Sequence, residues 1–239
     1  MVIIMNKLQM FSRFCLDIVY PNRCPCCYEF LPWNEYICSK CREKVLIDTS
    51  ELCSKCGKRK EDCICGAALK YDEAVAMSYY ENEAKNALIS MKNSSNKNFG
   101  IFAGEVLGNI IIKKPEWKSC DGIVPVPMNR WNKILRGYNQ AKIIANAISD
   151  VTGIPVMDDC LIKRFGYKSQ HSLNAADREK NTESFQPMGR DLEGMKLIIC
   201  DDIITTGNTL NRCAELLKMC GVEKVYAAVA ATVKRKREE

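Results

Sequence analysis

The sequence predicts an α/β fold, a parallel sheet with flanking helices, preceded by a small cysteine-rich module. From Leu69 onward, short apolar runs alternate with segments of helical periodicity, which is the pattern of strands and crossover helices in a parallel sheet. Ten of the 15 cysteines lie within the first 65 residues, where regular periodicity is weak. We therefore divide the 239 residues into a module at 1–66 and a domain at 67–239.

Apolar runs predict the strands of the second unit, and apolar residues at helical spacing predict its helices. Residues 165–188 are polar and irregular, and we find no internal repeat. In the first unit, apolar residues from Leu8 to Ile18 predict an amphipathic N-terminal helix. The predicted elements are a strand or strand pair at 71–80, helices at 82–91 and 99–112, a strand at 122–126, a helix at 139–151, strands at 161–164 and 197–200, a helix at 209–219 and a strand at 224–233.

Composition limits the location of the protein more than its partners. Hydrophobic residues make up 47% of the chain, and the net charge of +6 indicates a mild preference for anionic partners. The N-terminus lacks the continuous apolar core and the cleavage site of a secretory signal, and no stretch approaches the length of a membrane span. We expect a cytoplasmic protein without membrane insertion, whose cysteines bind metal rather than form disulfides.

The cysteine spacing predicts structural zinc. Two Cys-x-x-Cys pairs form a first set of four thiols, and a third pair with a closer Cys-x-Cys forms a second. The first set is Cys24, Cys27, Cys38 and Cys41, and the second is Cys53, Cys56, Cys63 and Cys65. The thiols could bind two Zn²⁺ ions in sequence or in an interleaved arrangement, or stay free. Four thiolates leave no position for water, so such zinc is structural, and the module could contact nucleic acid, protein or its own domain.

The segment from Lys196 to Leu210 joins an apolar run, an acid pair and a Thr/Gly-rich turn. The apolar run is typical of a buried parallel strand and leads into Asp201 and Asp202, whose carboxylates can accept hydrogen bonds from ribose hydroxyls. A turn then opens into a helix, where a phosphate binds well. The turn residues are Thr205, Thr206, Gly207, Asn208 and Thr209. Together these features resemble the phosphoribosyl pyrophosphate (PRPP) motif of type I phosphoribosyltransferases. The alternative is an acidic strand end followed by ordinary helix-capping residues.

A second motif lies earlier in the chain. The run at 124–127 predicts a strand end, followed by a basic loop with Arg130, Arg136 and Gly137 and by a helix that begins near Asn139. Arginine offers paired donors to phosphate oxygens, and glycine lets the backbone approach a ligand. Both motifs follow strands that we expect to be neighbours, at the sheet edge where open α/β folds bind ligands.

Taken together, the motifs resemble the ComF family (ComFC-like proteins), and the resemblance covers nearly the whole chain. That family joins an N-terminal cysteine zinc finger to a type I phosphoribosyltransferase domain. The resemblance rests on the Cys-x-x-Cys pairs, on the Pro-x-Pro and Arg-Gly-Tyr-Asn-Gln segments and on Asp201-Asp202. It also includes Arg164, Gln170, Leu173, Arg178, Asn181 and Phe185. It implies a phosphoribosyltransferase-like sheet with a hood, and a role in natural transformation, the uptake and handling of single-stranded DNA.

The resemblance also implies roles for the motif residues. Asp201 and Asp202 would bind the ribose 2′- and 3′-hydroxyls, residues 205–209 the 5′-phosphate, and Arg136 and Gly137 the pyrophosphate. Mg²⁺ would bridge pyrophosphate and ribose oxygens. A hood would cover the site, and polar side chains there could select an acceptor or meet a nucleic-acid strand. These are Arg164, Lys168, Gln170, His171, Arg178 and Asn181. The aromatic residues Tyr138, Phe165 and Tyr167 could stack on unpaired bases or pack the hood.

Three functions are compatible with these features. The first is a competence-type protein that binds PRPP and single-stranded DNA, with a competence helicase as a further partner. The second is an active phosphoribosyltransferase with an unidentified acceptor, and the third is a regulator that senses PRPP without turnover. The sequence does not decide whether the chain is an enzyme.

Overall fold

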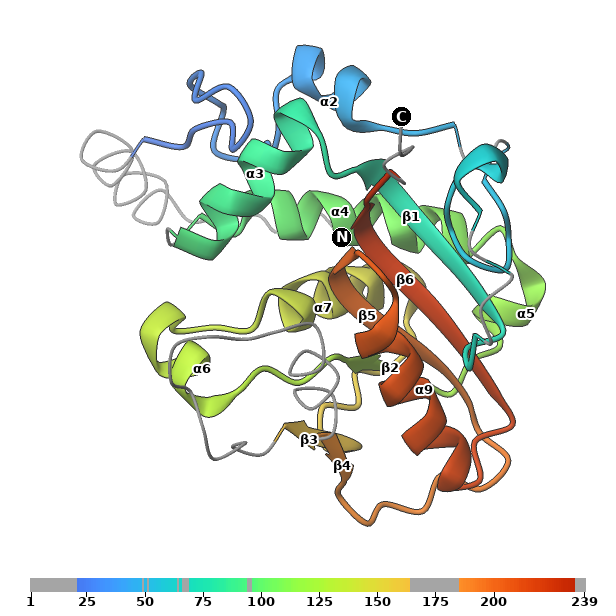
Figure 1. The fold of residues 1–239 in the computed structure, drawn as a ribbon. Helices are drawn as coiled ribbons and strands as arrows, with labels where there is room; N and C mark the ends of the chain where they lie inside the picture. The colour runs from blue at the N-terminus through green and yellow to red at the C-terminus, as the bar shows by residue number, and fades with distance from the viewer. Residues whose placement is uncertain are drawn as a thin grey trace, which may run out of the picture.

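The fold is built on a parallel sheet, which has four strands in the described part of the chain (Figure 1). The computed structural model describes residues 21–48, 50, 52–63, 65, 69–93, 96–163 and 185–234. The strands β1 (Glu73–Tyr79), β2 (Gly122–Pro125), β5 (Lys196–Ile204) and β6 (Lys224–Thr232) lie in the order β1-β6-β5-β2. Each neighbouring pair is parallel, so the predicted parallel sheet is confirmed.

Alternate residues of β5 face two different helical layers. Ile198 and Cys200 belong to a core shared with α3 (Asn82–Asn93), α4 (Asn98–Ile111) and α7 (Gln140–Thr152). Leu197 and Ile199 belong to a second core, on the side of α9 (Asn208–Met219). A parallel strand covered on both faces needs a continuous apolar run, which is why β5 starts with one.

Several elements differ from the predicted ones. β5 runs to Ile204, so both aspartates lie inside the strand rather than after it. Two short helices, α5 (Pro115–Lys118) and α6 (Arg130–Arg136), form where we predicted no element and a basic loop. The strand β3 (Leu161–Lys163) pairs antiparallel with β4 (Phe185–Pro187), at the end of the stretch that we predicted to be irregular. Elements this short show no period in a sequence.

The cysteine module contains a repeat that the sequence analysis missed. Tyr28 N–H donates to Cys24 O at 2.9 Å, and Gly57 N–H donates to Cys53 O at 2.8 Å. Tyr28 and Gly57 have left-handed φ angles of 64° and 69°. Each turn is closed by an antiparallel bridge, between residues 23 and 30 and between residues 52 and 59. The backbone therefore repeats although the sequences share little beyond Cys-x-x-Cys. The module is completed by α2 (Ser39–Val45) and the 3₁₀ turn η2 (Lys60–Asp62).

The module packs against its own domain. Ile47 N–H donates to Met77 O at 3.0 Å, and Ala74 N–H donates to Ser54 O at 2.8 Å, so both halves follow the outer edge of β1. Cys24 and Cys41 lie in the same hydrophobic core as residues of α4. The predicted N-terminal helix lies outside the described residues. None of the described helices combines the length and the apolar character needed to span a bilayer.

Candidate functional site

The two aspartates of β5 form an acid pair near the C-terminal edge of the sheet. The backbone N–H of Asp202 donates to Asp201 Oδ1 at 2.8 Å, and both residues are partly buried. Burial of the Asp201 carboxyl, together with the charge of Asp202, raises the pKa of Asp201 well above its usual range. The pair presents carboxyl oxygens that can accept hydrogen bonds from hydroxyls or ligate a hard cation such as Mg²⁺.

Lys92 is a site residue that the sequence analysis missed. It lies in the last turn of α3, and its Nζ is 3.0 Å from Asp202 Oδ2. Its positive charge lowers the pKa of Asp201, against the stronger effect of burial. No local pattern joins Lys92 to the acid pair, because only the packing of α3 against the sheet brings them together.

The Thr/Gly-rich turn after β5 forms a helix N-terminus. Gly207 is the N-cap of α9 and has a left-handed φ of 84°, which glycine adopts without the steric cost of a side chain. Its carbonyl accepts from Asn211 N–H at 2.8 Å. Thr205, Thr206 and Asn208 are exposed, and no acidic residue lies in the first turn of α9. Free N–H groups at the positive end of a helix, next to an acid pair, suit a phosphorylated sugar.

The predicted basic loop is a short helix with a sharp exit. The Asn129 side chain caps α6 by accepting from Asn132 N–H at 2.7 Å, and Gly137 ends it with a left-handed φ of 76°. Arg136 is therefore the last residue of a helix rather than part of an open loop. The strands that precede the two motifs, β2 and β5, are hydrogen-bonded neighbours, as we predicted. The helix α7 begins at Gln140, with Asn139 as its N-cap, which is close to the start predicted for the helix at 139–151.

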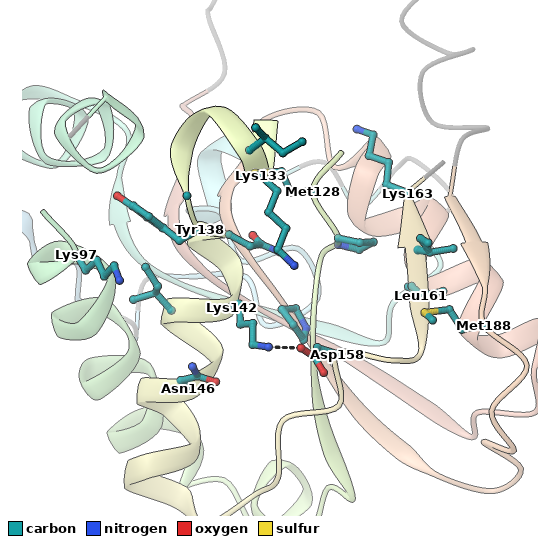
Figure 2. Close-up of a pocket in the computed structure, with 17 residues that line it drawn as sticks. Lys97, Met128, Lys133, Tyr138, Lys142, Asn146, Asp158, Leu161, Lys163 and Met188 are labelled. Atoms are coloured by element: carbon teal, nitrogen blue, oxygen red, sulfur yellow. Dashed lines mark hydrogen bonds and ion pairs between the residues drawn. The ribbon is translucent and has the colours of Figure 1, made fainter. Parts of the chain in front are cut away.

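A cavity of about 840 Å³ lies beyond the end of β2, between α7 and the β3–β4 pair (Figure 2). Gly137 and Tyr138 line it, whereas Asp201 and Asp202 do not. The lining contains one acid among the described residues, Asp158, which forms an ion pair with a lysine of α7. Its basic residues are Lys97, Lys133, Lys142 and Lys163. The cavity is therefore positively charged, and Lys97 Nζ lies 5.2 Å from the centre of the Tyr138 ring.

The eight predicted thiols gather in two groups that follow chain order. Within each group, the sulfur atoms lie within 4.8 Å of one another. Four sulfurs held at about 2.3 Å around a tetrahedral zinc ion stand about 3.8 Å apart. The Sγ atoms of Cys27 and Cys38 are 3.7 Å apart, and those of Cys56 and Cys63 are also 3.7 Å apart. The residues therefore fit two structural zinc ions, bound in sequence and not interleaved. No described cysteine forms a disulfide.

In each cysteine group the surroundings lower the pKa of one thiol, whereas burial raises the pKa of Cys27 and Cys41 in the first group and of Cys65 in the second. Burial raises the pKa of the Cys24 thiol, but backbone hydrogen bonds from Cys38, Cys27 and Cys26 outweigh it and bring the pKa down to about 7. In the second group, backbone and side-chain hydrogen bonds likewise outweigh burial and bring the pKa of Cys53 to about 7. One thiol of each group is thus prepared for deprotonation by its surroundings.

Part of the predicted hood lies outside the described residues. Of the residues that the resemblance implies for this region, Phe185 and the nearby Tyr138 are described, and those from Arg164 to Asn181 are not. Tyr138 is partly buried, and its hydroxyl donates to Met91 O at the end of α3. Phe185 is the first residue of β4 and is buried, with Lys163 Nζ at 4.8 Å from its ring centre. These two aromatic rings therefore pack against the protein itself.

Comparison with known proteins gives matches to both parts of the chain. Residues 136–239 match the phosphoribosyl transferase domain, and residues 15–71 match the double zinc ribbon domain. Competence protein F of Haemophilus influenzae is 28% identical over 206 residues, which cover 79% of this chain and 87% of that protein. DNA utilization protein YhgH of Salmonella typhimurium is 23% identical over 218 residues, 87% of this chain and 96% of that protein. Competence protein ComFC of Bacillus subtilis is 22% identical over 214 residues, 82% of this chain and 81% of that protein.

Proposed function

We propose that this chain, a ComF-like protein by its matches to the double zinc ribbon domain and the phosphoribosyl transferase domain, acts in DNA uptake or DNA use and binds a phosphorylated ribose. The relatives named for competence and for DNA utilization support the physiological role. The ligand that best fits the chemistry of the site is PRPP with Mg²⁺.

One observation carries this proposal. β5 contains an acid pair near its C-terminal end, and the chain then turns through left-handed Gly207 into a helix whose first turn contains no acid. Asp201 and Asp202 would accept hydrogen bonds from the ribose hydroxyls, and residues 205–209 would hold the 5′-phosphate through N–H and hydroxyl groups. Arg136 and Gly137 would contact the pyrophosphate from the end of α6. Bound Mg²⁺ would neutralise phosphate charge and share the oxygen ligands of the acid pair.

The cavity beside this site supports an additional polyanionic partner. Its four lysines and single described acid give it positive charge, and the exposed Ile134 of α6 also lines it. We propose that single-stranded DNA follows this surface, with its phosphates on the lysines. Such binding would weaken steeply as salt rises, because each phosphate contact releases counterions.

A catalysed transfer is the second candidate function, favoured by the position of the cavity next to the Gly137 turn, where an acceptor could lie. In that reaction the bond from C1 of the ribose to pyrophosphate breaks as C1 bonds to the acceptor, and pyrophosphate leaves. The protein would position the reactants and stabilise charge. Release of pyrophosphate would distinguish this function from binding or sensing of PRPP without turnover.

Calorimetric titration of PRPP with Mg²⁺ tests the proposal. We expect wild type to bind in the micromolar range and an Asp201→Asn/Asp202→Asn variant to lose binding. Asp159→Asn is the matched control, because this acid is exposed, pairs with Arg190 and is not one of the proposed binding residues. Wild-type protein that shows no binding at millimolar PRPP would overturn the proposal, as would equal losses in the two variants.

A further inference from the structure

Tyr71 lies behind the proposed phosphate loop, residues 205–209, and its hydroxyl has no hydrogen-bond partner among the described residues. Its side chain is 1% exposed and packs in the core shared with Ala76 and Leu210. A Cβ placed on Gly207 would lie 3.7 Å from this hydroxyl. A buried hydroxyl without a partner is costly, so its position directly under the loop needs an explanation.

The segment that carries Tyr71 is tied to the start of α9. Lys70 N–H donates to Asn211 Oδ1 at 3.0 Å, and Asn211 N–H donates in turn to Gly207 O at 2.8 Å. Asp72 then continues into β1, with its N–H donating to Val225 O at 2.7 Å. Any shift of residues 70–72 would therefore be transmitted to Gly207 and to the first turn of α9.

The second cysteine group lies on the other side of the same segment. Ser54, within the Cys53-x-x-Cys56 turn, accepts from Ala74 N–H at 2.8 Å. Gly57 approaches β1 so closely that a Cβ there would lie 3.2 Å from Ala74 Cβ. The second group is therefore fixed to the start of β1, directly after the segment that carries Tyr71.

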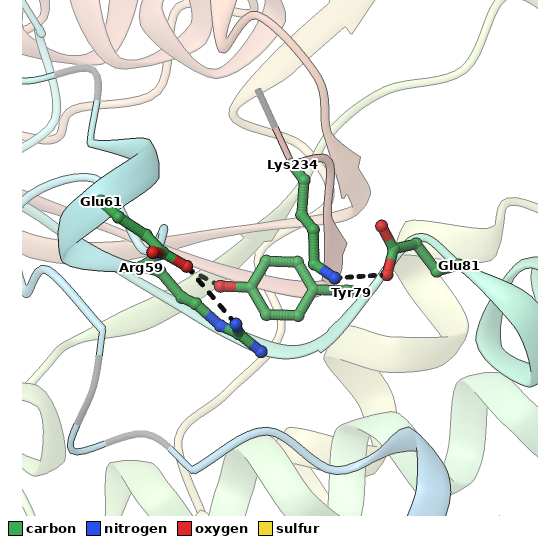
Figure 3. Close-up of polar contacts among 5 residues, drawn as sticks. All are labelled: Arg59, Glu61, Tyr79, Glu81 and Lys234. Atoms are coloured by element: carbon green, nitrogen blue, oxygen red, sulfur yellow. Dashed lines mark hydrogen bonds and ion pairs between the residues drawn. The ribbon is translucent and has the colours of Figure 1, made fainter. Parts of the chain in front are cut away.

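The far end of this half of the module is also fixed to the sheet. Lys58 is 3% exposed, and its ammonium group donates to Val233 O, just after β6. Tyr79, at the end of β1, receives a hydrogen bond at its hydroxyl from Arg59 N–H at 3.2 Å. Arg59 and Lys234 both lie over the Tyr79 ring, at 4.8 Å and 5.1 Å from its centre (Figure 3). The second group is therefore held between the β1–β6 end and the Tyr71 segment.

We propose that zinc on Cys53, Cys56, Cys63 and Cys65 supports the phosphate loop, and that Tyr71 is the positioning residue that connects the two. The idea rests on the proposed function for its ligand, but the structural coupling stands independently of it. The first cysteine group should not share this role, because it packs on α3 and α4 rather than on Tyr71. Loss of zinc from the second group would thus loosen the loop and weaken phosphate binding.

Matched cysteine variants test this coupling. Cys53→Ser/Cys65→Ser removes ligands of the second group, and Cys24→Ser/Cys38→Ser removes ligands of the first. Each is measured for zinc content, for amide hydrogen exchange in residues 205–211 and for the affinity of PRPP with Mg²⁺. We expect each variant to lose one zinc ion per chain. Only the second-group variant should show faster exchange in the loop and roughly tenfold weaker binding, as expected for the loss of one to two hydrogen bonds.

Tyr71→Leu provides a test without metal loss. It should keep both zinc ions, yet it removes the phenol group that lies against Gly207, so exchange at 205–211 should become faster, whereas exchange in α4 stays at the wild-type rate. Equal exchange changes in both cysteine variants, or wild-type exchange in the second-group variant and in Tyr71→Leu, would overturn the inference. If wild type fails to bind PRPP, only the proposed function falls, since the exchange measurement still decides the coupling.

Discussion

At the scale of single residues, Asp201 shows how a binding site is kept at a cost in stability. Burial and the charge of Asp202 raise the pKa of the Asp201 carboxyl. Lys92 lowers this pKa only in part, because its ammonium group pairs directly with Asp202. A group whose folded pKa lies above its unfolded pKa binds more protons in the folded state. Its contribution to the free energy of unfolding therefore falls as pH rises through that interval. Such local cost is typical of sites built for a ligand.

We predict that Asp201→Asn stabilises the ligand-free protein. The amide carries no charge to desolvate, so Tm should rise by roughly 2–4 °C, the effect of about 1 kcal/mol in a chain of this size. The gain over wild type should grow between pH 5 and pH 8, by the sign given above, and binding of PRPP should be lost. Thermal denaturation by circular dichroism at several pH values measures this.

The control is Asp202→Asn, which removes the partner of Lys92 and should leave Tm unchanged or lower. A lower Tm for Asp201→Asn at pH 8 would contradict the prediction.

At the scale of elements, α6 decides how the two motifs meet. It turns the predicted basic loop into a capped helix, places Arg136 at its end and sets Lys133 on the cavity. The other basic residues of that cavity come from the start of α4, from α7 and from β3. The charge of the cavity therefore depends on four elements spread over residues 97–163, and no single segment shows it.

We predict that Lys133→Gln/Lys163→Gln weakens binding of a fluorescent oligothymidine and flattens its salt dependence. The slope of log K against log salt should fall by about 0.7 for each phosphate that the variant no longer neutralises. Fluorescence anisotropy at several salt concentrations measures both quantities.

Lys113→Gln/Lys118→Gln removes the same charge from exposed positions outside the cavity, and should have little effect. Equal weakening by the two pairs would show that only the net charge of the protein matters.

At the scale of the whole molecule, the zinc ribbon and the sheet share one interior. Cys24, Cys41 and Val45 lie in the same core as Phe99 and Phe102 of α4, and the second cysteine group follows the edge of β1. The thiols are thus part of the packing of the domain, and metal binding there contributes to the folding free energy of the whole chain.

We predict that removal of zinc lowers the Tm of a single unfolding transition and does not produce a second transition. A strong chelator should reduce Tm with the transition still cooperative, as seen by calorimetry. Acidification from pH 7 to about pH 4 should release the metal, since protons compete with zinc for the thiolates of both groups. A metal-sensitive dye measures the release. An early separate transition for the ribbon, or full zinc retention at pH 4, would contradict this.

Sequence alone determined the parallel α/β fold and the two cysteine sets, because buried strands, Cys-x-x-Cys turns and the Asp-Asp motif are local patterns. The sequence also predicted that β2 lies beside β5, because ligand-binding motifs in open α/β folds follow neighbouring strands. Only the tertiary structure decided that the thiols group in chain order, that Lys92 meets Asp202, that α6 replaces a loop and that Tyr71 lies under Gly207. These features join residues distant in the chain or rest on elements of a few residues, and packing alone specifies them.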